Sequence, residues 1–203
     1  DLPERVSAIC RGTLLARDWV STPANDKTPD LLARDMVRHA EAAGLKAAVM
    51  EETFLAEKKF GALLAVARGS RNPPRMVVMT HEPKKARRTA VLVGKGVTFD
   101  TGGINLKSSE GLKAMKSDMA GAAATAATLV AIAHLKPKYR VVGLMPLVEN
   151  MPSGDATRPG DIVKTYSGKT VEIGNTDAEG RLILADVLSY AVETYQPDLV
   201  IDM

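Results

Sequence analysis

Short runs of apolar and β-branched residues alternate along this chain with longer segments whose apolar positions recur every three or four residues. The short runs predict strands, and the longer segments predict amphipathic helices. We expect strands at residues 46–50, 76–80, 89–93, 141–148, 162–165, 170–173 and 198–202. We expect helices at residues 5–19, 29–43, 119–135 and 182–195, the second with Thr28 as N-cap. This alternation favours an α/β layered domain with a mostly parallel central sheet flanked by helices.

The same pattern indicates how the domain lies in the chain. Residues 1–22 predict a linker helix, and residues 23–203 predict one domain, long enough to bury a core. The last predicted strand resembles a central strand with nothing after it. We therefore expect the domain to be truncated at its C-terminal end and to continue in a parent protein.

Composition excludes several classes of protein. Hydrophobic residues make up 45% of the chain and charged residues 25%, which is typical of a soluble globular domain. No uninterrupted apolar run approaches the roughly 18 to 20 residues needed to cross a bilayer, so no membrane partner is expected. Cys10 is the only cysteine, which excludes an internal disulfide and suits a reducing, cytoplasmic location. We expect Cys10 to be a buried helix residue.

The net charge of +3 raises the question of nucleic-acid binding. The densest basic cluster, residues 84–88, reads Lys-Lys-Ala-Arg-Arg and has no interleaved aromatic residues. Binding to single-stranded nucleic acid usually needs aromatic side chains on which bases stack. We interpret the cluster as a solvated loop between two strands, and nucleic acid is not an expected partner.

The segment of residues 175–182 reads Asn-Thr-Asp-Ala-Glu-Gly-Arg-Leu and sets Asp177, Glu179 and Arg181 at every second position. In an extended segment alternate side chains point the same way, so two carboxylates and a guanidinium would converge. Two acids that close repel each other unless protons or metal ions neutralise them. The segment therefore indicates a charged site just before an apolar helix.

A matching set of residues lies upstream: Lys95, Asp100, Lys107 and Asp118. Residues 91–103 predict a strand that runs into a glycine-rich loop, and Asp118 stands near the start of the alanine-rich helix, where an N-cap is its alternative role. Both clusters follow predicted strands, and active sites of parallel sheets gather at the carboxyl ends of strands. Together they predict a carboxylate-rich two-metal site and a metallohydrolase.

Two alternatives to this site are weaker. A nucleotide cradle at the glycine-rich loop lacks the Gly-Lys-Ser/Thr ending of a P-loop. A histidine-based zinc triad is not expected, because His39, His81 and His134 all lie away from these motifs. An oxygen-rich ligand set suits Mn²⁺, Mg²⁺ or Zn²⁺.

Three segments, residues 93–103, 115–121 and 175–182, closely resemble the motifs of the leucyl aminopeptidase family. The resemblance implies a co-catalytic pair of divalent ions, Zn²⁺ or Mn²⁺, with Mg²⁺ and Co²⁺ as alternatives. In the family pattern Asp100 and Glu179 would bridge both ions. Lys95 and Asp118 would complete the tighter site, and Asp177 would complete the more exchangeable one.

The resemblance also implies roles for two cationic side chains. Lys107 would stay charged and polarise the scissile carbonyl. Arg181 would hold a bicarbonate ion that acts as general base toward a metal-bridging water. The substrate would be a peptide with a free N-terminus, whose α-amine would bind one metal near Asp118 and whose leucine-like side chain would occupy a pocket that includes Met115.

At the level of the whole protein, the resemblance implies a homo-hexamer and makes residues 23–203 a partial catalytic metallopeptidase domain. Relatives carry an N-terminal domain and residues beyond the final strand, which we expect the parent protein to supply. Two alternative functions stay open. One is a DNA-binding or architectural role of the parent protein, and the other is a different two-metal hydrolase acting on phosphoesters.

Overall fold

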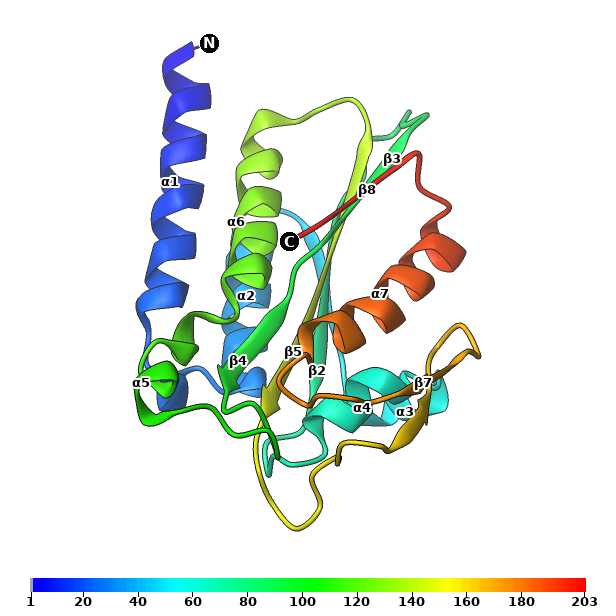
Figure 1. Cartoon of the computed structure of the whole chain (residues 1–203). Helices are drawn as coiled ribbons and strands as arrows, with labels where there is room; N and C mark the ends of the chain where they lie inside the picture. The colour runs from blue at the N-terminus through cyan, green and yellow to red at the C-terminus, as the bar shows by residue number, and fades with distance from the viewer. Residues whose placement is uncertain (1) are drawn as a thin grey trace.

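A mixed sheet forms the centre of the fold in the computed structural model, which describes residues 2–203 (Figure 1). Within these residues the strands are β1 (Lys46–Met50), β2 (Arg75–His81), β3 (Thr89–Val93), β4 (Gly96–Asp100), β5 (Arg140–Asn150) and β8 (Leu199–Asp202). The order is β1-β2-β5-β3-β8, and β4 also pairs with β5. The β5–β3, β3–β8 and β5–β4 pairings are parallel, and β2 alone runs opposite to the other strands, antiparallel to both β1 and β5. The predicted α/β domain with a mostly parallel sheet is confirmed.

Helices cover both faces of this sheet (Figure 1). One face carries α1 (Leu2–Ser21), α2 (Pro29–Ala42) and α6 (Ala120–Leu135), and the other carries α3 (Glu52–Glu57), α4 (Gly61–Ala67) and α7 (Gly180–Tyr195). The remaining elements are small: η1 (Ala24–Asp26), α5 (Ser109–Leu112), η2 (Met115–Ser117) and the hairpin of β6 (Ile162–Lys164) and β7 (Thr170–Glu172). The helical layers therefore sandwich the sheet as the sequence predicts.

The core divides into two apolar clusters because successive residues of a strand point to opposite faces. Along β5, Val142 and Leu144 pack in the cluster beneath α4 and α7, while Val141 and Met145 pack in the cluster beneath α2 and α6. All four side chains are almost fully buried. Strand β5 thus contributes to both clusters and lies at the middle of the sheet.

Helix α6 packs closely because it consists largely of alanine. Ala122, Ala123 and Ala126 are fully buried, and α1 approaches so closely that a Cβ at Gly12 would lie 3.1 Å from the carbonyl oxygen of Ala127. By length and composition alone the stretch Ser109–Leu135 could cross a membrane, although no single apolar run is that long. In the fold this stretch comprises α5, η2 and α6, and the burial of α6 is that of a core helix.

Several elements differ from the sequence predictions. Residues 96–100 form strand β4, where we predicted a glycine-rich loop, because Gly96 lets the chain pair with β5; a Cβ there would lie 2.2 Å from the carbonyl oxygen of Pro146. Helices α3 and α4 were not predicted, since each is shorter than three turns. Cys10 lies in α1 as expected but is exposed, not buried. The side chain of Thr28 accepts no capping hydrogen bond.

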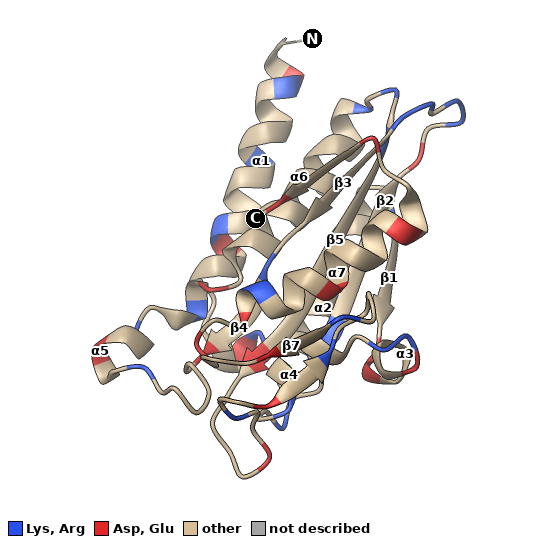
Figure 2. Cartoon of the chain, turned by 45° about the vertical axis from the view of Figure 1, so that its right-hand side comes forward, with Lys and Arg blue, Asp and Glu red and all other residues tan. Residues whose placement is uncertain are grey.

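The basic cluster at residues 84–88 lies in the loop between β2 and β3, at the edge of the molecule (Figure 2). Its four cationic side chains, Lys84, Lys85, Arg87 and Arg88, are all exposed. The interpretation of this cluster as a solvated loop is confirmed.

One buried carboxylate joins α7 to α4, which lie on the same face of the sheet. Asp186 of α7 is fully buried and accepts hydrogen bonds from the backbone N–H groups of Ala62 and Leu63, each at 2.9 Å, and of Tyr166 at 2.7 Å. The first two of these bonds satisfy N–H groups in the first turn of α4, which have no partner within their own helix. Burial nevertheless raises the pKa of Asp186, because it outweighs the effect of the three N–H donors.

Replacing Asp186 by Ala should destabilise the fold, because three backbone N–H groups would lose a charged acceptor. We expect a loss of about 3 kcal/mol in the free energy of unfolding. For a chain of this size the melting temperature should fall by roughly 6–12 °C. Thermal unfolding followed by circular dichroism measures the change. Ser189→Ala, which removes only a hydrogen bond to Ala185 within the same helix, is the matched control and should change little.

Candidate metal centre

The candidate site begins at a break between two strands. Strands β3 and β4 follow each other along the same side of β5, with Val93 opposite Leu144 and Gly96 opposite Leu147. Between them, the N–H of Lys95 donates to Met203 and its carbonyl accepts from Ala122 at the start of α6. The backbone of Lys95 is thus held by Met203, the residue after β8, and by α6 instead of by β5.

Glycines make this break possible. A Cβ at Gly94 would lie 2.3 Å from the carbonyl oxygen of Gly121, and one at Gly121 would lie 2.3 Å from that of Met203. Farther on, Gly180 leaves room for the side chain of Lys95, because a Cβ there would lie 2.7 Å from its Cε atom. Glycine at these three positions therefore lets the chain segments around Lys95 approach one another, because a side chain at any of them would clash.

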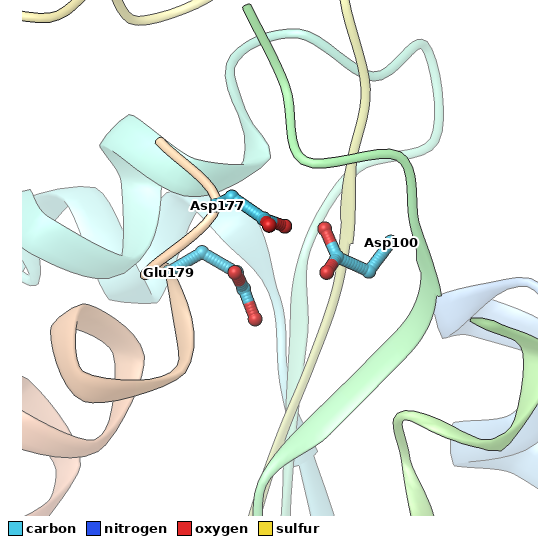
Figure 3. A group of neighbouring side chains, drawn as sticks. All are labelled: Asp100, Asp177 and Glu179. Atoms are coloured by element: carbon cyan, nitrogen blue, oxygen red, sulfur yellow. The ribbon is translucent and has the colours of Figure 1, made fainter. Parts of the chain in front are cut away.

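Three carboxylates meet beside this break. Asp100 comes from the carboxyl end of β4, while Asp177 and Glu179 come from the turn before α7, and the three point toward one another (Figure 3). One oxygen from each lies within 4.8 Å of the others. Asp100 and Glu179 are 2% exposed, whereas the side chain of Asp177 is 33% exposed. The cluster is therefore open to solvent on the side of Asp177.

The reason for this convergence differs from the one predicted. Residues 175–180 form a turn that leads into α7 and not an extended segment, and Glu179 has helical backbone angles. The two carboxylates still converge, because the turn directs both toward the end of β4. Arg181 does not join them: it is exposed in the first turn of α7 and forms no ion pair within residues 2–203.

Two lysines lie between the carboxylates as counter-charges. Lys95 Nζ is 2.7 Å from Asp118 Oδ1 and 2.8 Å from Glu179 Oε1. Lys107 Nζ is 2.9 Å from Asp100 Oδ2 and forms a second ion pair with Asp177 Oδ1. The structure thus brings together Lys95, Asp100, Lys107, Asp118, Asp177 and Glu179, six of the seven residues that the sequence assigned to the site.

The lysines and carboxylates change one another's pKa values. Burial lowers the pKa of Lys95, but the hydrogen bonds and charges of Asp118 and Glu179 outweigh it and raise the pKa above its usual value. For Lys107, burial is likewise outweighed by Asp177 and Asp100, and the pKa is raised. Burial raises the pKa of both Asp118 and Glu179, and Lys95 offsets only part of that effect.

The site holds more negative charge than these lysines neutralise. Four carboxylates face two ammonium groups, and two of the carboxylate oxygens, Asp118 Oδ2 and Glu179 Oε2, are buried without a hydrogen-bond partner. A buried acceptor without a partner is costly. Oxygen donors of this kind are the ligands that hard and borderline divalent cations prefer. The residues therefore fit a metal centre.

Asp118 reaches the site from an element that the sequence analysis did not predict. It lies at the end of η2, and the N-cap position of α6 is Met119. The alternative role of Asp118 as an N-cap is therefore wrong. The three histidines lie elsewhere, as predicted: His39 beside Asp35 in α2, His81 at the end of β2 and His134 in the exposed last turn of α6.

Sequence reasoning missed the polar residues that hold the two loops of the site together. Thr176 and Asn105 form a clasp in which the N–H of Asn105 donates to Thr176 Oγ1 at 2.9 Å and the N–H of Thr176 donates to Asn105 Oδ1 at 2.8 Å. Thr176 Oγ1 also donates to the carbonyl of Gly102 at 2.6 Å. The clasp joins the loop that carries Lys107 to the turn that carries Asp177. The only available signal was position, since Thr176 lies within the motif of residues 175–182 and Asn105 lies two residues after the motif of residues 93–103.

The fold and the site define an α/β domain with a carboxylate–lysine cluster at the carboxyl end of a parallel strand. The chain belongs to the cytosol aminopeptidase family, because a model of that family's catalytic domain matches residues 14–203. It is 50% identical to a probable cytosol aminopeptidase of Chlorobaculum tepidum over 189 residues, which are 93% of this chain and 38% of the relative. It is 46% identical to a probable cytosol aminopeptidase of Streptomyces coelicolor over 200 residues, 98% of this chain and 38% of the relative.

The structural comparison agrees with this assignment. The bottromycin maturation enzyme BotP in complex with Mn superposes with a TM-score of 0.92 at 48% sequence identity, over 96% of this chain and 43% of that one. A second structure of BotP gives a TM-score of 0.88. The chain spans about two fifths of the length of the curated relatives it matches, since their aligned share is 38%.

Replacing Thr176 by Val should loosen the clasp without changing the shape of the side chain. We expect a loss of about 2 kcal/mol in the free energy of unfolding, because the partly buried N–H of Asn105 and the buried carbonyl of Gly102 would lose their shared hydroxyl. Urea unfolding measures this loss. Thr13→Val, whose hydroxyl bonds only to Ile9 on an exposed helix face, is the control. Equal stability of the two variants would contradict the clasp.

Proposed function

We propose that this chain carries the metal centre of an aminopeptidase that removes leucine-like residues from the N-termini of peptides. The observation that carries the proposal is the convergence of four carboxylates and two lysines, with two buried carboxylate oxygens left without a partner. Membership of the cytosol aminopeptidase family supports it.

The residues that would hold two divalent ions are Lys95, Asp100, Asp118, Asp177 and Glu179. Lysine can bind a metal only as a neutral amine, a form that adjacent cations favour. Two bound ions would supply Lewis acidity, which lowers the pKa of a water molecule and stabilises negative charge on a carbonyl oxygen. Zn²⁺ and Mn²⁺ are the ions we propose, with Mg²⁺ and Co²⁺ as alternatives, and the Mn complex of BotP supports a metal role for this fold.

Lys107 would act on the substrate directly. Its ammonium pairs with Asp100 and Asp177, and cations bound to these two carboxylates would replace it there. The freed ammonium could then donate a hydrogen bond to the scissile carbonyl and stabilise the oxyanion that forms on it. Its position between carboxylates from β4 and from the turn before α7 supports this role.

Two other side chains would position ligands around the carbonyl. Arg181 is exposed in the first turn of α7, where its guanidinium and the helix N-terminus would hold a bicarbonate ion as general base. The free α-amine of a peptide would bind at one of the two ions, near Asp118. That contact would confine cleavage to the N-terminal residue.

The assembly and location of the whole protein are proposed on the resemblance to the family. We propose a homo-hexamer in the cytoplasm, with peptides as its substrates. The name of the family and the names of the relatives support the peptide substrate.

Titration of Mn²⁺ into metal-free protein tests the centre itself. We expect two ions per chain by calorimetry, because the five proposed ligands all lie in this chain. Asp177→Ala should reduce the stoichiometry or weaken one of the two binding events. Asp155→Ala, which removes an exposed carboxylate from a loop, is the control and should leave binding unchanged. A folded chain that binds no Mn²⁺ would contradict the proposal.

Hydrolysis of leucine p-nitroanilide by the whole protein tests the role of Lys107. Lys107→Met should lower kcat roughly 10²–10³-fold, the cost of losing one donor to an oxyanion. Mn²⁺ stoichiometry should not fall, since Lys107 is not a proposed ligand. Lys113→Met, which breaks only an exposed pair with Glu110, is the control. Turnover of p-nitrophenyl phosphate in preference to the anilide would favour a phosphoesterase instead.

A further inference from the structure

One buried side-chain amide donates hydrogen bonds to both chain segments that supply the three carboxylates of the candidate centre. The side chain of Asn150, the last residue of β5, is 4% exposed. Its Nδ2 donates to Asp100 Oδ1 at 2.8 Å and to the carbonyl oxygen of Thr176 at 3.0 Å. Asp100 belongs to β4 and Thr176 to the turn that carries Asp177 and Glu179. A single NH₂ group therefore joins the two chain segments from which three carboxylates come.

The chemistry of the neighbours requires an NH₂ group at this place. A carboxylate and a backbone carbonyl are both acceptors, so only a group with two N–H donors satisfies them together. An aspartate in the same position would place a third acceptor against them. Because both partners are acceptors, the NH₂ group of the amide faces them and the amide oxygen does not.

Asn150 also helps to orient the two carboxylate oxygens of Asp100. Asp100 Oδ1 accepts from Asn150 and also from the N–H of Gly102 at 2.8 Å. Asp100 Oδ2 is the oxygen that pairs with Lys107. Two donors thus fix the rotation of the carboxylate about its bond to Cβ and turn Oδ2 toward the other charged groups.

The backbone of Asn150 is held independently of its side chain. Asn150 lies opposite Asp100 in the β4–β5 register, and its carbonyl accepts from both the N–H and the Oγ1 of Thr101, at 2.9 and 2.8 Å. A change at the side chain should therefore leave the strands in register. The two hydrogen bonds that the side-chain amide donates can therefore be removed without displacing β5 from the sheet.

We propose that Asn150 is a positioning residue of the metal centre, which holds Asp100 at a fixed rotation and at a fixed separation from Asp177 and Glu179. The proposal rests on the proposed metal-binding function and assigns to it a residue that supplies no ligand atom. Groups that hydrogen-bond to metal ligands orient them, and their loss typically weakens metal binding about 10–100-fold.

The test compares Mn²⁺ binding by the wild-type chain, Asn150→Ala and Asn150→Asp, using calorimetry and the electron paramagnetic resonance spectrum of the bound ion. We expect both variants to weaken Mn²⁺ binding about 10–100-fold and to broaden the spectrum. The Asp variant keeps the size of the side chain but lacks the donors. Wild-type affinity in the Ala variant, or tighter binding in the Asp variant, would overturn the proposal.

The control is Asn72→Ala. Asn72 Nδ2 donates to Glu149 Oε2 at 2.9 Å, so this variant also removes an amide–carboxylate bond at the end of β5, from the residue adjacent to Asn150. A merely structural effect should lower the melting temperatures of the Asn72 and Asn150 variants alike. Only the Asn150 variants should weaken Mn²⁺ binding, and equal weakening by Asn72→Ala would overturn the proposal.

Hydrogen exchange separates failure of this proposal from failure of the proposed function. If the wild-type chain binds no Mn²⁺, the metal function fails, and the positioning role is judged in metal-free protein. There, Asn150→Ala should speed amide exchange at residues 176–179 at least tenfold relative to Asn72→Ala. Unchanged exchange in that segment would overturn the positioning role as well.

Discussion

Four carboxylates from three separate stretches of the chain gather around Lys95 and Lys107, and the repulsion among them is the constraint that the rest of the structure satisfies. Burial strengthens this repulsion, because it removes the water that would otherwise screen the charges. The chain offsets it with the ammonium groups of Lys95 and Lys107 and with N–H donors from Asn150 and Gly102. None of these groups could remain there without a rigid frame. The two apolar clusters on either face of the sheet supply that frame.

Strand β5 connects this frame to the site. It is the longest strand among residues 2–203, it pairs with β2, β3 and β4, and its side chains enter both apolar clusters. Its final residue, Asn150, is the one whose amide reaches Asp100 and Thr176. The packing that stabilises the fold and the hydrogen bonds that orient the carboxylates therefore share one segment. Along β5, no loop separates the middle of the sheet from the site.

The sequence predicted most of the sheet and most of the charged residues, and the reasons for its errors are physical. Strand β3 is a run of apolar and β-branched residues, so its pattern was readable, whereas β4 begins with Gly96 and carries the polar residues Thr98 and Asp100. Asp177 and Glu179 were found by their spacing, although the turn that joins them is not extended. Asn150 could not be found, because its importance lies in contacts with residues 50 and 26 positions away. Local pattern reveals an element or a cluster of charge, but it does not reveal which distant acceptors an amide will meet.

The position of the single tryptophan has a practical consequence. Trp19 is 5% exposed, it packs in the cluster beneath α2 and α6, and its indole N–H donates to Asp35 at 2.7 Å. Three of the four tyrosines, Tyr166, Tyr190 and Tyr195, gather with the opposite cluster, whereas Tyr139 is exposed. The two faces of the sheet therefore carry different chromophores. Tryptophan emission reports on one helical layer and tyrosine absorbance on the other, so spectroscopy can establish without any added label whether the two layers separate from the sheet together or in succession.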